Sequence, residues 1–258
     1  MRASQLARHL YIRLLRKRIK DELTRQRVKL LLWDIWGYWP WLTARLPPRD
    51  RLLLLGRFLR IDWNVLHGHK PIEISYVLRE LTQRSSQDEI VIEAGCWKGG
   101  STTKLSLVCE RLDYRLIVCD SFEGVAPHAP VEGEFNFSGL YAATEDEVRT
   151  NLARYGANNF EIRKGWFSET LKPGSIRSTV RLVFIDCDLA PATADVLKGV
   201  LPALSVDGVV FTQDFHIPSV RQVLSIHKLE TEHLARNLAA CRQGATSSYV
   251  PASLFDSN

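Results

Sequence analysis

Hydrophobic positions change their spacing along the chain, and this change separates strands from helices. Short apolar runs occupy residues 90–92, 116–119, 160–163, 182–185 and 209–212. Between them, apolar residues recur at three- and four-residue steps in 101–111, 145–155, 191–204 and 218–227. Strands that alternate with helices of this length form right-handed βαβ units. The pattern therefore predicts an α/β fold with a parallel sheet that helices cover on both faces.

The chain before this region has a helical pattern. Apolar residues recur among arginines at helical spacing, at Leu6, Leu10, Leu14, Leu15, Ile19 and Leu23. The run LLLWDIWGYWPWL follows, with four tryptophans close together, and residues 50–86 again have helical spacing. We therefore divide the chain into a basic, Trp-rich helical arm, 1–60, and a main domain, 61–258. Near the C-terminus, 237–250 is compatible with two closing antiparallel strands, although the pattern there is weak.

The net charge of +5 is distributed unevenly. Residues 1–30 hold ten Lys and Arg against two acidic residues, a local charge of +8, so the remainder carries −3. A basic amphipathic helix followed by clustered tryptophans is typical of a segment at a membrane surface. It is equally typical of an arm whose aromatic face packs on the main domain or on a second subunit. We favour packing, and keep peripheral contact of residues 1–42 with the inner membrane surface as the alternative.

Composition restricts the partners and the compartment. No nucleic-acid-binding motif accompanies the basic charge, so we expect no nucleic acid partner. Five cysteines without a C-x-x-C spacing indicate reduced, buried thiols. The sequence has neither an apolar stretch of about eighteen residues nor the hydrophobic segment of a signal peptide. We therefore expect a cytoplasmic protein, and we expect it to form a homo-oligomer.

The segment IVIEAGCWKGGSTTKLSL, 90–107, joins the first strand to the first helix of the alternating region. The strand ends at Glu93, and Gly95, Gly99 and Gly100 allow a tight turn and a close approach to a ligand. Ser101 then begins the helix as part of an N-cap. Because the carboxyl ends of parallel strands hold ligands, this turn is the first candidate for a binding site.

The second strand ends with LIVCDSFEG, which places Asp120 about twenty-five residues after the turn. An acidic side chain at this position accepts hydrogen bonds from both ribose hydroxyls of a nucleoside. The ordinary alternative is a helix or turn cap, and one carboxylate can satisfy both roles. The glycine spacing G-x-x-x-G-G differs from the dinucleotide pattern, and no Y-x-x-x-K pair is present. A nicotinamide-dependent oxidoreductase on a similar sheet is therefore the weaker alternative.

Five segments, EAGCWKGGST, CDSFEG, KGWFSETL, FIDCDL and VDGVVFTQDF, each end a predicted strand. In this order and spacing they resemble the macrocin O-methyltransferase family of S-adenosylmethionine-dependent, class I methyltransferases. The resemblance covers roughly residues 75–225. It implies the class I, Rossmann-like fold, with a mostly parallel sheet covered by helices, here preceded by a helical N-terminal arm. It also implies methyl transfer from S-adenosylmethionine to a hydroxyl of a sugar or a glycosylated small molecule.

The resemblance assigns roles to residues of the cofactor site. The glycine-rich turn would approach the methionyl part of S-adenosylmethionine, with Glu93 orienting the turn. Asp120 would take the ribose hydroxyls, while Gly165 and Trp166 would border the adenine, unless Trp166 belongs to the core. The expected cofactor contacts are Glu93, Gly95, Gly99, Gly100, Ser101, Asp120, Ser121, Gly165, Trp166 and Asp186.

Members of the family also bind magnesium through carboxylates after the fourth and fifth strands. Here Asp186 and Asp214 match those positions, and Gln213 stands where the family has a further Asp. The implied ligands are therefore Asp186, Gln213 and Asp214, with one negative charge fewer than in the family. In the alternative interpretation, Asp186 contacts the ammonium group of the cofactor and Asp214 caps the helix that starts near Pro218.

Methyl transfer to a hydroxyl releases a proton, so the site needs a base. His216 follows Asp214 closely and is the first candidate, and Asp188 is the second catalytic candidate. Other histidines that the fold can bring close are His128, His67 and His69. The long segment 121–144 is typical of a lid that shapes the acceptor pocket. The changed residues at 190–192 and at Gln213 keep a third reading open, in which a degenerate scaffold binds a partner.

Overall fold

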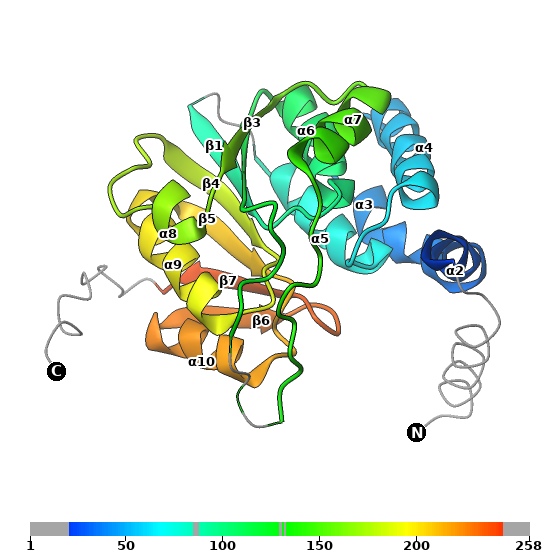
Figure 1. The fold of residues 1–258 in the computed structure, drawn as a ribbon. Coiled ribbons are helices and arrows are strands. Elements are labelled where there is room, and N and C mark those ends of the chain that lie inside the picture. The colour runs from blue at the N-terminus through cyan, green and yellow to red at the C-terminus, as the bar shows by residue number, and fades with distance from the viewer. Residues whose placement is uncertain (1–20, 85–87, 129–130, 132, 245–258) are drawn as a thin grey trace, which may run out of the picture.

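The computed structural model describes residues 21–84, 88–128, 131 and 133–244. In these residues the chain forms a seven-stranded sheet with the order β3-β2-β1-β4-β5-β7-β6 (Figure 1). The strands are β1 (Glu89–Ala94), β2 (Arg115–Asp120), β3 (Phe160–Lys164), β4 (Thr179–Ile185), β5 (Leu204–Thr212), β6 (Leu229–His233) and β7 (Ala239–Gln243). Strands β1 to β5 pair in parallel, and β7 runs antiparallel to both β5 and β6. The predicted α/β class and its five parallel strands are confirmed.

Helices cover both faces of the sheet (Figure 1). The helices are α2 (Glu22–Lys29), α3 (Trp39–Leu42), α4 (Pro48–Asn64), α5 (Pro71–Leu81), α6 (Gly100–Leu112), α7 (Glu145–Arg154), α8 (Phe167–Thr170), α9 (Ala190–Val200) and α10 (Pro218–Ile226). Short π and 3-10 turns fill 30–38, and a further 3-10 turn fills 201–203. Of these elements, α3 to α7 pack on one face and α8 to α10 on the other, as the two buried clusters record.

The alternation of side chains along β1 explains why the protein has two cores. Val91 points into the cluster beneath α5 and α6, while Ile90 and Ile92 point into the cluster beneath α9 and α10. Both faces of the strand are therefore buried, which explains its uninterrupted apolar run. Strand order reverses between β1 and β4, whose outward connections run to opposite sides of the sheet. A ligand site is expected at the carboxyl ends of these two strands.

The arm is only partly within the described residues. The amphipathic helix predicted from Leu6 to Leu23 lies mostly outside them, and α2 starts where Asp21 caps the Thr24 amide at 2.6 Å. Further along, the ring of Trp39 lies 5.9 Å from that of Tyr76 on α5, and the Ser75 hydroxyl donates to the Gly37 carbonyl at 2.9 Å. This part of the arm therefore packs on the main domain as expected. The boundary predicted at 60–61 falls inside α4, and the division into two domains stays a prediction.

The two antiparallel strands at the end of the sheet lie at other positions along the chain than the sequence predicted. Of the predicted stretch, residues 237–244 are described and contain β7, while its partner β6 comes earlier, directly after α10. Hydrophobic spacing did not predict β6, because four of its five residues are exposed. Across the described ranges, no helix combines the length and apolar character needed to cross a bilayer.

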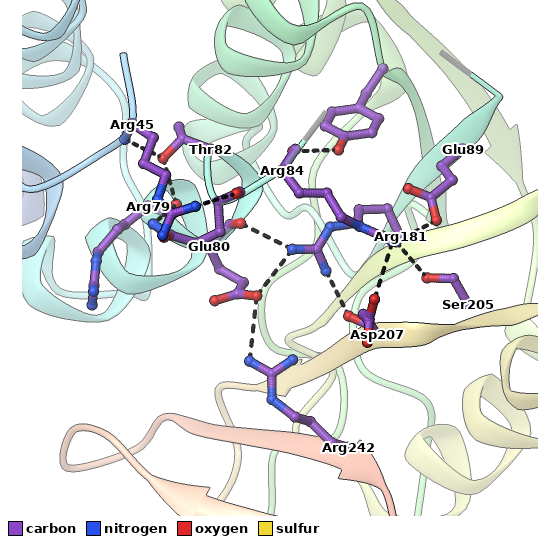
Figure 2. A network of polar contacts seen from close by, with 12 residues as sticks. Arg45, Arg79, Glu80, Thr82, Arg84, Glu89, Arg181, Ser205, Asp207 and Arg242 are labelled. Carbon is purple, nitrogen blue, oxygen red and sulfur yellow. Dashed lines mark hydrogen bonds and ion pairs between the residues drawn. The ribbon is translucent and has the colours of Figure 1, made fainter. Parts of the chain in front are cut away.

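A buried polar network fixes the sheet at the amino ends of its parallel strands (Figure 2). Arg181 on β4 is 2% exposed and donates hydrogen bonds to Glu80 Oε1 at 3.0 Å and to the Asp207 carbonyl at 3.0 Å. Arg84 donates to Glu89 Oε1 at 2.6 Å, at the first residue of β1. The network joins the end of α5 to β1, β4 and β5, at the opposite end of the sheet from the switch point.

Candidate active site

A cavity of about 240 Å³ opens at the carboxyl ends of the parallel strands, where the strand order reverses. Each parallel strand contributes the residues that follow it. Of the predicted cofactor contacts, those that line the cavity are Gly95, Gly100, Ser101, Asp120, Ser121, Gly165, Trp166 and Asp186. Of the predicted metal and catalytic residues, those that line it are Gln213, Asp214, Asp188 and His216. The fold therefore brings together nearly all of the residues that the sequence singled out.

The glycine-rich turn is packed so closely that side chains are excluded from it. Gly95 has φ of +91°, and a Cβ there would lie 2.0 Å from the Asp186 carbonyl oxygen. A Cβ on Gly100 would lie 2.8 Å from Cβ of His67. The first glycine thus lets β1 and β4 approach each other at the switch point, and the last admits the segment before α5. Both requirements are met only by glycine.

Two predicted cofactor contacts, Glu93 and Gly99, do not line the cavity. Gly99 is instead the left-handed N-cap of α6. Glu93 is fully buried behind the turn, and burial raises its pKa to about 7, although the Ser101 and Thr102 hydroxyls oppose this increase. Glu93 lies on the same face of β1 as Val91, which packs toward α5 and α6, and the predicted roles of Glu93 and Gly99 in cofactor binding stay predictions.

Asp120 ties the ends of the first two strands together. Its Oδ2 accepts a hydrogen bond from the Cys96 amide at 2.7 Å, and its Oδ1 accepts one from the Phe122 amide at 2.7 Å. A carboxylate has about four acceptor positions, so each oxygen keeps one for a ligand. The cap interpretation is therefore correct for Asp120, and it leaves the side chain able to accept ribose hydroxyls as well.

Three carboxylates gather at the other end of the cavity. Burial and the nearby Asp214 raise the pKa of Asp188 to about 8. Burial also raises the pKa of Asp214 to about 6. The Cys187 and Asp188 amides donate to its Oδ2 at 3.0 and 2.9 Å, and these hydrogen bonds oppose the increase. The pKa of Asp186 is well above its usual value through burial and the charges of both neighbours. This cluster would gain stability from a bound cation.

The alternative role of Asp214 as the cap of α10 is wrong. Asp214 turns toward the loop after β4, and a different acid serves the helix. Glu134 in the 121–144 segment accepts hydrogen bonds from the Ser219 amide and hydroxyl, both at 2.8 Å. A carboxylate at a helix N-terminus is favourable because it meets free N–H groups there.

Gln213 has a partner that sequence reasoning missed. Its Nε2 donates to Oε2 of Glu73 at 2.7 Å, and Glu73 is fully buried in the first turn of α5. The Lys70 amide donates to the same oxygen at 2.7 Å. An aspartate at 213 would face this carboxylate without a donor, so the glutamine is explained by Glu73. The position of Glu73 at N3 of a helix was visible in the sequence, but its contact with residue 213 was not.

The oxygen donors at this end of the cavity suit magnesium in kind. The carboxylates of Asp186 and Asp214 carry raised pKa values, and Oε1 of Gln213 is buried without a hydrogen-bond partner. The described side chains that converge most closely in the manner of metal ligands lie elsewhere, however, at Asp62, His67 and His69. The residues therefore fit the chemistry of magnesium, while their oxygens are not drawn together as a closed ligand set.

A lysine pairs with two members of the Asp62, His67 and His69 group. The Lys104 ammonium group donates to Asp62 Oδ1 and, at 2.8 Å, to His69 Nε2. Nε2 of His67 lies 3.0 Å from the same aspartate oxygen. Asp62, His69 and Lys104 are at most 3% exposed, and the two histidines also line the cavity. Sequence spacing gave no sign of this group, because Lys104 joins it from α6.

The remaining histidine candidates differ in their access to the cavity. Partial burial lowers the pKa of His216 below its usual value, so the ring is neutral near pH 7. His128 does not line the cavity, and its Nδ1 lies 3.0 Å from the Ala126 carbonyl oxygen. His69 is held by Lys104, which donates to its Nε2. His216 lines the cavity two residues after Asp214, and its role as the base stays a prediction.

The segment between β2 and α7 folds over the cavity, as predicted for a lid. The Val125 amide donates to the Leu140 carbonyl at 2.9 Å, so the two sides of the segment are joined. Tyr141 closes against the glycine-rich turn, with its ring 5.2 Å from that of Trp97. Val125, Phe137 and Tyr141 line the cavity. Residues 129, 130 and 132 of this segment lie outside the described ranges.

The strand order with an antiparallel β7, the glycine turn after β1 and the acid after β2 define a class I methyltransferase. Comparison with known proteins agrees with this class. The chain belongs to the macrocin-O-methyltransferase (TylF) family, whose model matches residues 75–241. Its family membership makes it an O-methyltransferase. The alternative prediction of a nicotinamide-dependent oxidoreductase is therefore wrong.

Individual relatives agree with the family. Over 187 residues the chain is 32% identical to the 8-demethyl-8-(2,3-dimethoxy-alpha-L-rhamnosyl)-tetracenomycin-C 4'-O-methyltransferase of Streptomyces olivaceus, covering 66% of this chain and 70% of that protein. The structure of the O-methyltransferase NovP is similar with a TM-score of 0.57 and 22% identity, covering 91% of this chain and 98% of the other. The structure of the S-adenosylhomocysteine-bound Podospora anserina methyltransferase PaMTH1 is similar with a TM-score of 0.52 and 13% identity, covering 87% of this chain and 97% of the other. The two structures support the fold.

Proposed function

We propose that this protein transfers a methyl group from S-adenosylmethionine to a hydroxyl of a sugar or of a glycosylated small molecule. The observation that carries the proposal is a single cavity that joins a nucleoside-type turn to an acidic cluster under a lid. Family membership and the rhamnosyl acceptor in the name of the Streptomyces olivaceus relative support the reaction and the acceptor class.

The cofactor would lie along the ends of β1, β2 and β3. Gly95 and Gly100 leave space for the methionyl part, and Asp120 keeps acceptor positions for the ribose hydroxyls. Gly165 and Trp166 follow β3 and would form the adenine wall. S-adenosylmethionine supplies a sulfonium methyl group, so that its S–CH₃ bond breaks as the new O–CH₃ bond forms and neutral S-adenosylhomocysteine leaves.

The proton of the acceptor hydroxyl would pass to His216. This ring is neutral near pH 7 and lines the cavity beside the acidic cluster. Asp188, whose pKa is about 8 when no cation is bound, would orient the acceptor through a hydrogen bond. His216 thus acts as the base and Asp188 as the orienting group at the same hydroxyl.

Magnesium is part of the proposal in a limited form. Asp186, Gln213 and Asp214 would hold the ion, which would lower the pKa of a coordinated acceptor hydroxyl. The raised pKa values of the two carboxylates and the unpartnered buried oxygen of Gln213 support this assignment. We also propose a cytoplasmic location, which the free cysteines support, and assembly into a homo-oligomer stays a prediction.

Methyl transfer to matched acceptors would test the proposed function. The panel pairs glycosides with their aglycones and free sugars, with labelled S-adenosylmethionine and with either magnesium or a chelator. We expect label on a glycoside or sugar, loss of transfer with His216→Ala, and slower transfer under the chelator. Label on an aglycone alone would contradict the acceptor class, and transfer that is independent of His216 would contradict the base.

A further inference from the structure

An apolar surface on the arm is unused by the methyltransferase site. We call it the Trp face; its members are Leu31, Leu32, Ile35, Trp36, Trp39 and Leu42. Trp36 is 83% exposed, Leu31 is 63% exposed and Trp39 is 53% exposed. Six large apolar side chains within twelve residues form a concentration that is unusual on a protein surface and marks a docking site.

The Trp face is held in place from beneath. Tyr38 and Trp41, which alternate with the exposed residues, are buried against Phe58 in the core. The Ser75 hydroxyl on α5 donates to the Gly37 carbonyl at 2.9 Å, and the Tyr38 hydroxyl donates to buried Asp62. The exposed side chains are therefore presented by an anchored segment, which costs little conformational entropy when a partner binds.

Charge indicates what covers this face. The thirty residues that lead into it carry a net charge of +8, while the rest of the chain carries −3. A second copy docking here would bring an equally basic arm alongside, and the two would repel each other. An anionic lipid surface attracts the basic arm, and its headgroup region favours tryptophan beside Lys and Arg.

We propose that the Trp face docks this protein on an anionic membrane surface, with tryptophan and leucine side chains in the headgroup region. The arm would lie on the membrane without crossing it, in keeping with the lack of a spanning helix among the described residues. The same arm contacts the methyltransferase site, since the His67 amide donates to Oε1 of Gln26 at 3.3 Å and His67 lines the cavity.

Flotation with vesicles tests the proposal directly. The full chain is mixed with vesicles of phosphatidylcholine alone or with one third phosphatidylglycerol, at low and high salt. We expect flotation with the anionic vesicles only, weakened by salt. The double variant Leu31→Ser/Trp36→Ser should reduce the bound fraction about tenfold. Val206→Ser, which changes a 96% exposed residue on β5, is the matched control and should float like the unchanged chain.

Three outcomes would overturn the proposal. They are no flotation of the folded chain, equal flotation of the double variant, and a dimer that the double variant converts to a monomer. The dimer is measured by analytical ultracentrifugation on the same samples. None of these measurements uses methyl transfer, so they test membrane docking independently of the proposed reaction. A negative flotation result would not contradict the reaction, and a lack of methyl transfer would not contradict docking.

Discussion

At the scale of single residues, the buried side-chain amide of Gln213 is a hydrogen-bond donor to the buried carboxylate of Glu73. Its Nε2 donates to Oε2 of Glu73, and Asp214 lies next to it in the chain. Replacing Gln213→Asp puts a second carboxylate against Glu73 and removes its donor. We expect the free energy of unfolding at pH 7.5 to fall by more than about 2 kcal/mol, measured by urea denaturation. The combined Glu73→Gln/Gln213→Asp variant should recover most of this loss, and unchanged stability of the single variant would contradict the account.

The acidic cluster makes a prediction about pH. In the folded protein the pKa of Asp188 is about 8, above its value in the unfolded chain, so the folded state keeps a proton that the unfolded state releases. The resulting penalty on stability is absent near pH 4, grows as the pH rises toward 8, and is constant above that value. Asp188→Asn removes it. The variant should therefore be more stable than the unchanged protein by more than about 1 kcal/mol at pH 8, without a comparable gain at pH 4.5.

Denaturation curves at these two pH values would show the difference. A gain of the same size at both would mean that the asparagine stabilises through packing, and the raised pKa would lose its support. The measurement is made without magnesium, because a bound cation would itself lower the pKa of the cluster.

Several residues of the site could be predicted from the sequence, and the reason is local. Gly95, Asp120 and Asp186 each follow a predicted strand, and parallel strands bring their carboxyl ends to one edge. Glu73 and Lys104 could not be predicted in the same way. Each lies on a helix and meets its partner only through packing between distant segments. Hydrophobic spacing along the sequence does not predict such contacts.

At the scale of elements, Glu134 joins the described part of the lid to α10. Glu134 accepts two hydrogen bonds from Ser219 at the start of this helix, and Ser138 of the same segment donates its hydroxyl toward His128. Glu134→Ala should leave α10 without this cap and release the lid. We expect amide hydrogen exchange in 121–144 to become about 5- to 30-fold faster, with little change in global stability.

The matched control for the lid is Glu161→Ala. This glutamate pairs with Arg163 on β3, outside the 121–144 segment. Exchange in 121–144 should be unchanged in the control when measured by mass spectrometry. Equal exchange in both variants would mean that Glu134 does not hold the lid.

Most of the elements followed from hydrophobic spacing, and α8, β6 and the turns at 30–38 did not. Strands β1 to β5 and helices α6, α7, α9 and α10 lie where the periodicity placed them, because each buries a face against the sheet. Strand β6 was missed, since it is exposed and lacks the apolar alternation on which the prediction relied. The π and 3-10 turns at 30–38 were also missed, because their geometry follows from how Tyr38 and Trp41 pack on α4.

At the scale of the whole molecule, the Arg181 network and the ligand cavity lie at opposite ends of the sheet. The Arg181 network fixes the amino ends of the strands (Figure 2), while the cavity lies at their carboxyl ends. Arg181→Met leaves the Glu80 side chain without this buried partner. We expect unfolding free energy to fall by about 3 kcal/mol, with the affinity for S-adenosylhomocysteine unchanged. A large loss of affinity in a folded variant would show that the two ends are coupled.

The central claim is that the cavity holds S-adenosylmethionine with Asp120 at its ribose, and calorimetric titration tests it most directly. Titrations with S-adenosylmethionine and S-adenosylhomocysteine are compared for the unchanged chain, Asp120→Asn, and the exposed-surface control Asp146→Ala on α7. We predict micromolar binding that Asp120→Asn weakens about tenfold or more and that the control retains. Absence of heat with either compound from folded, unchanged protein would contradict the account, and would leave the family fold as a scaffold with a different ligand.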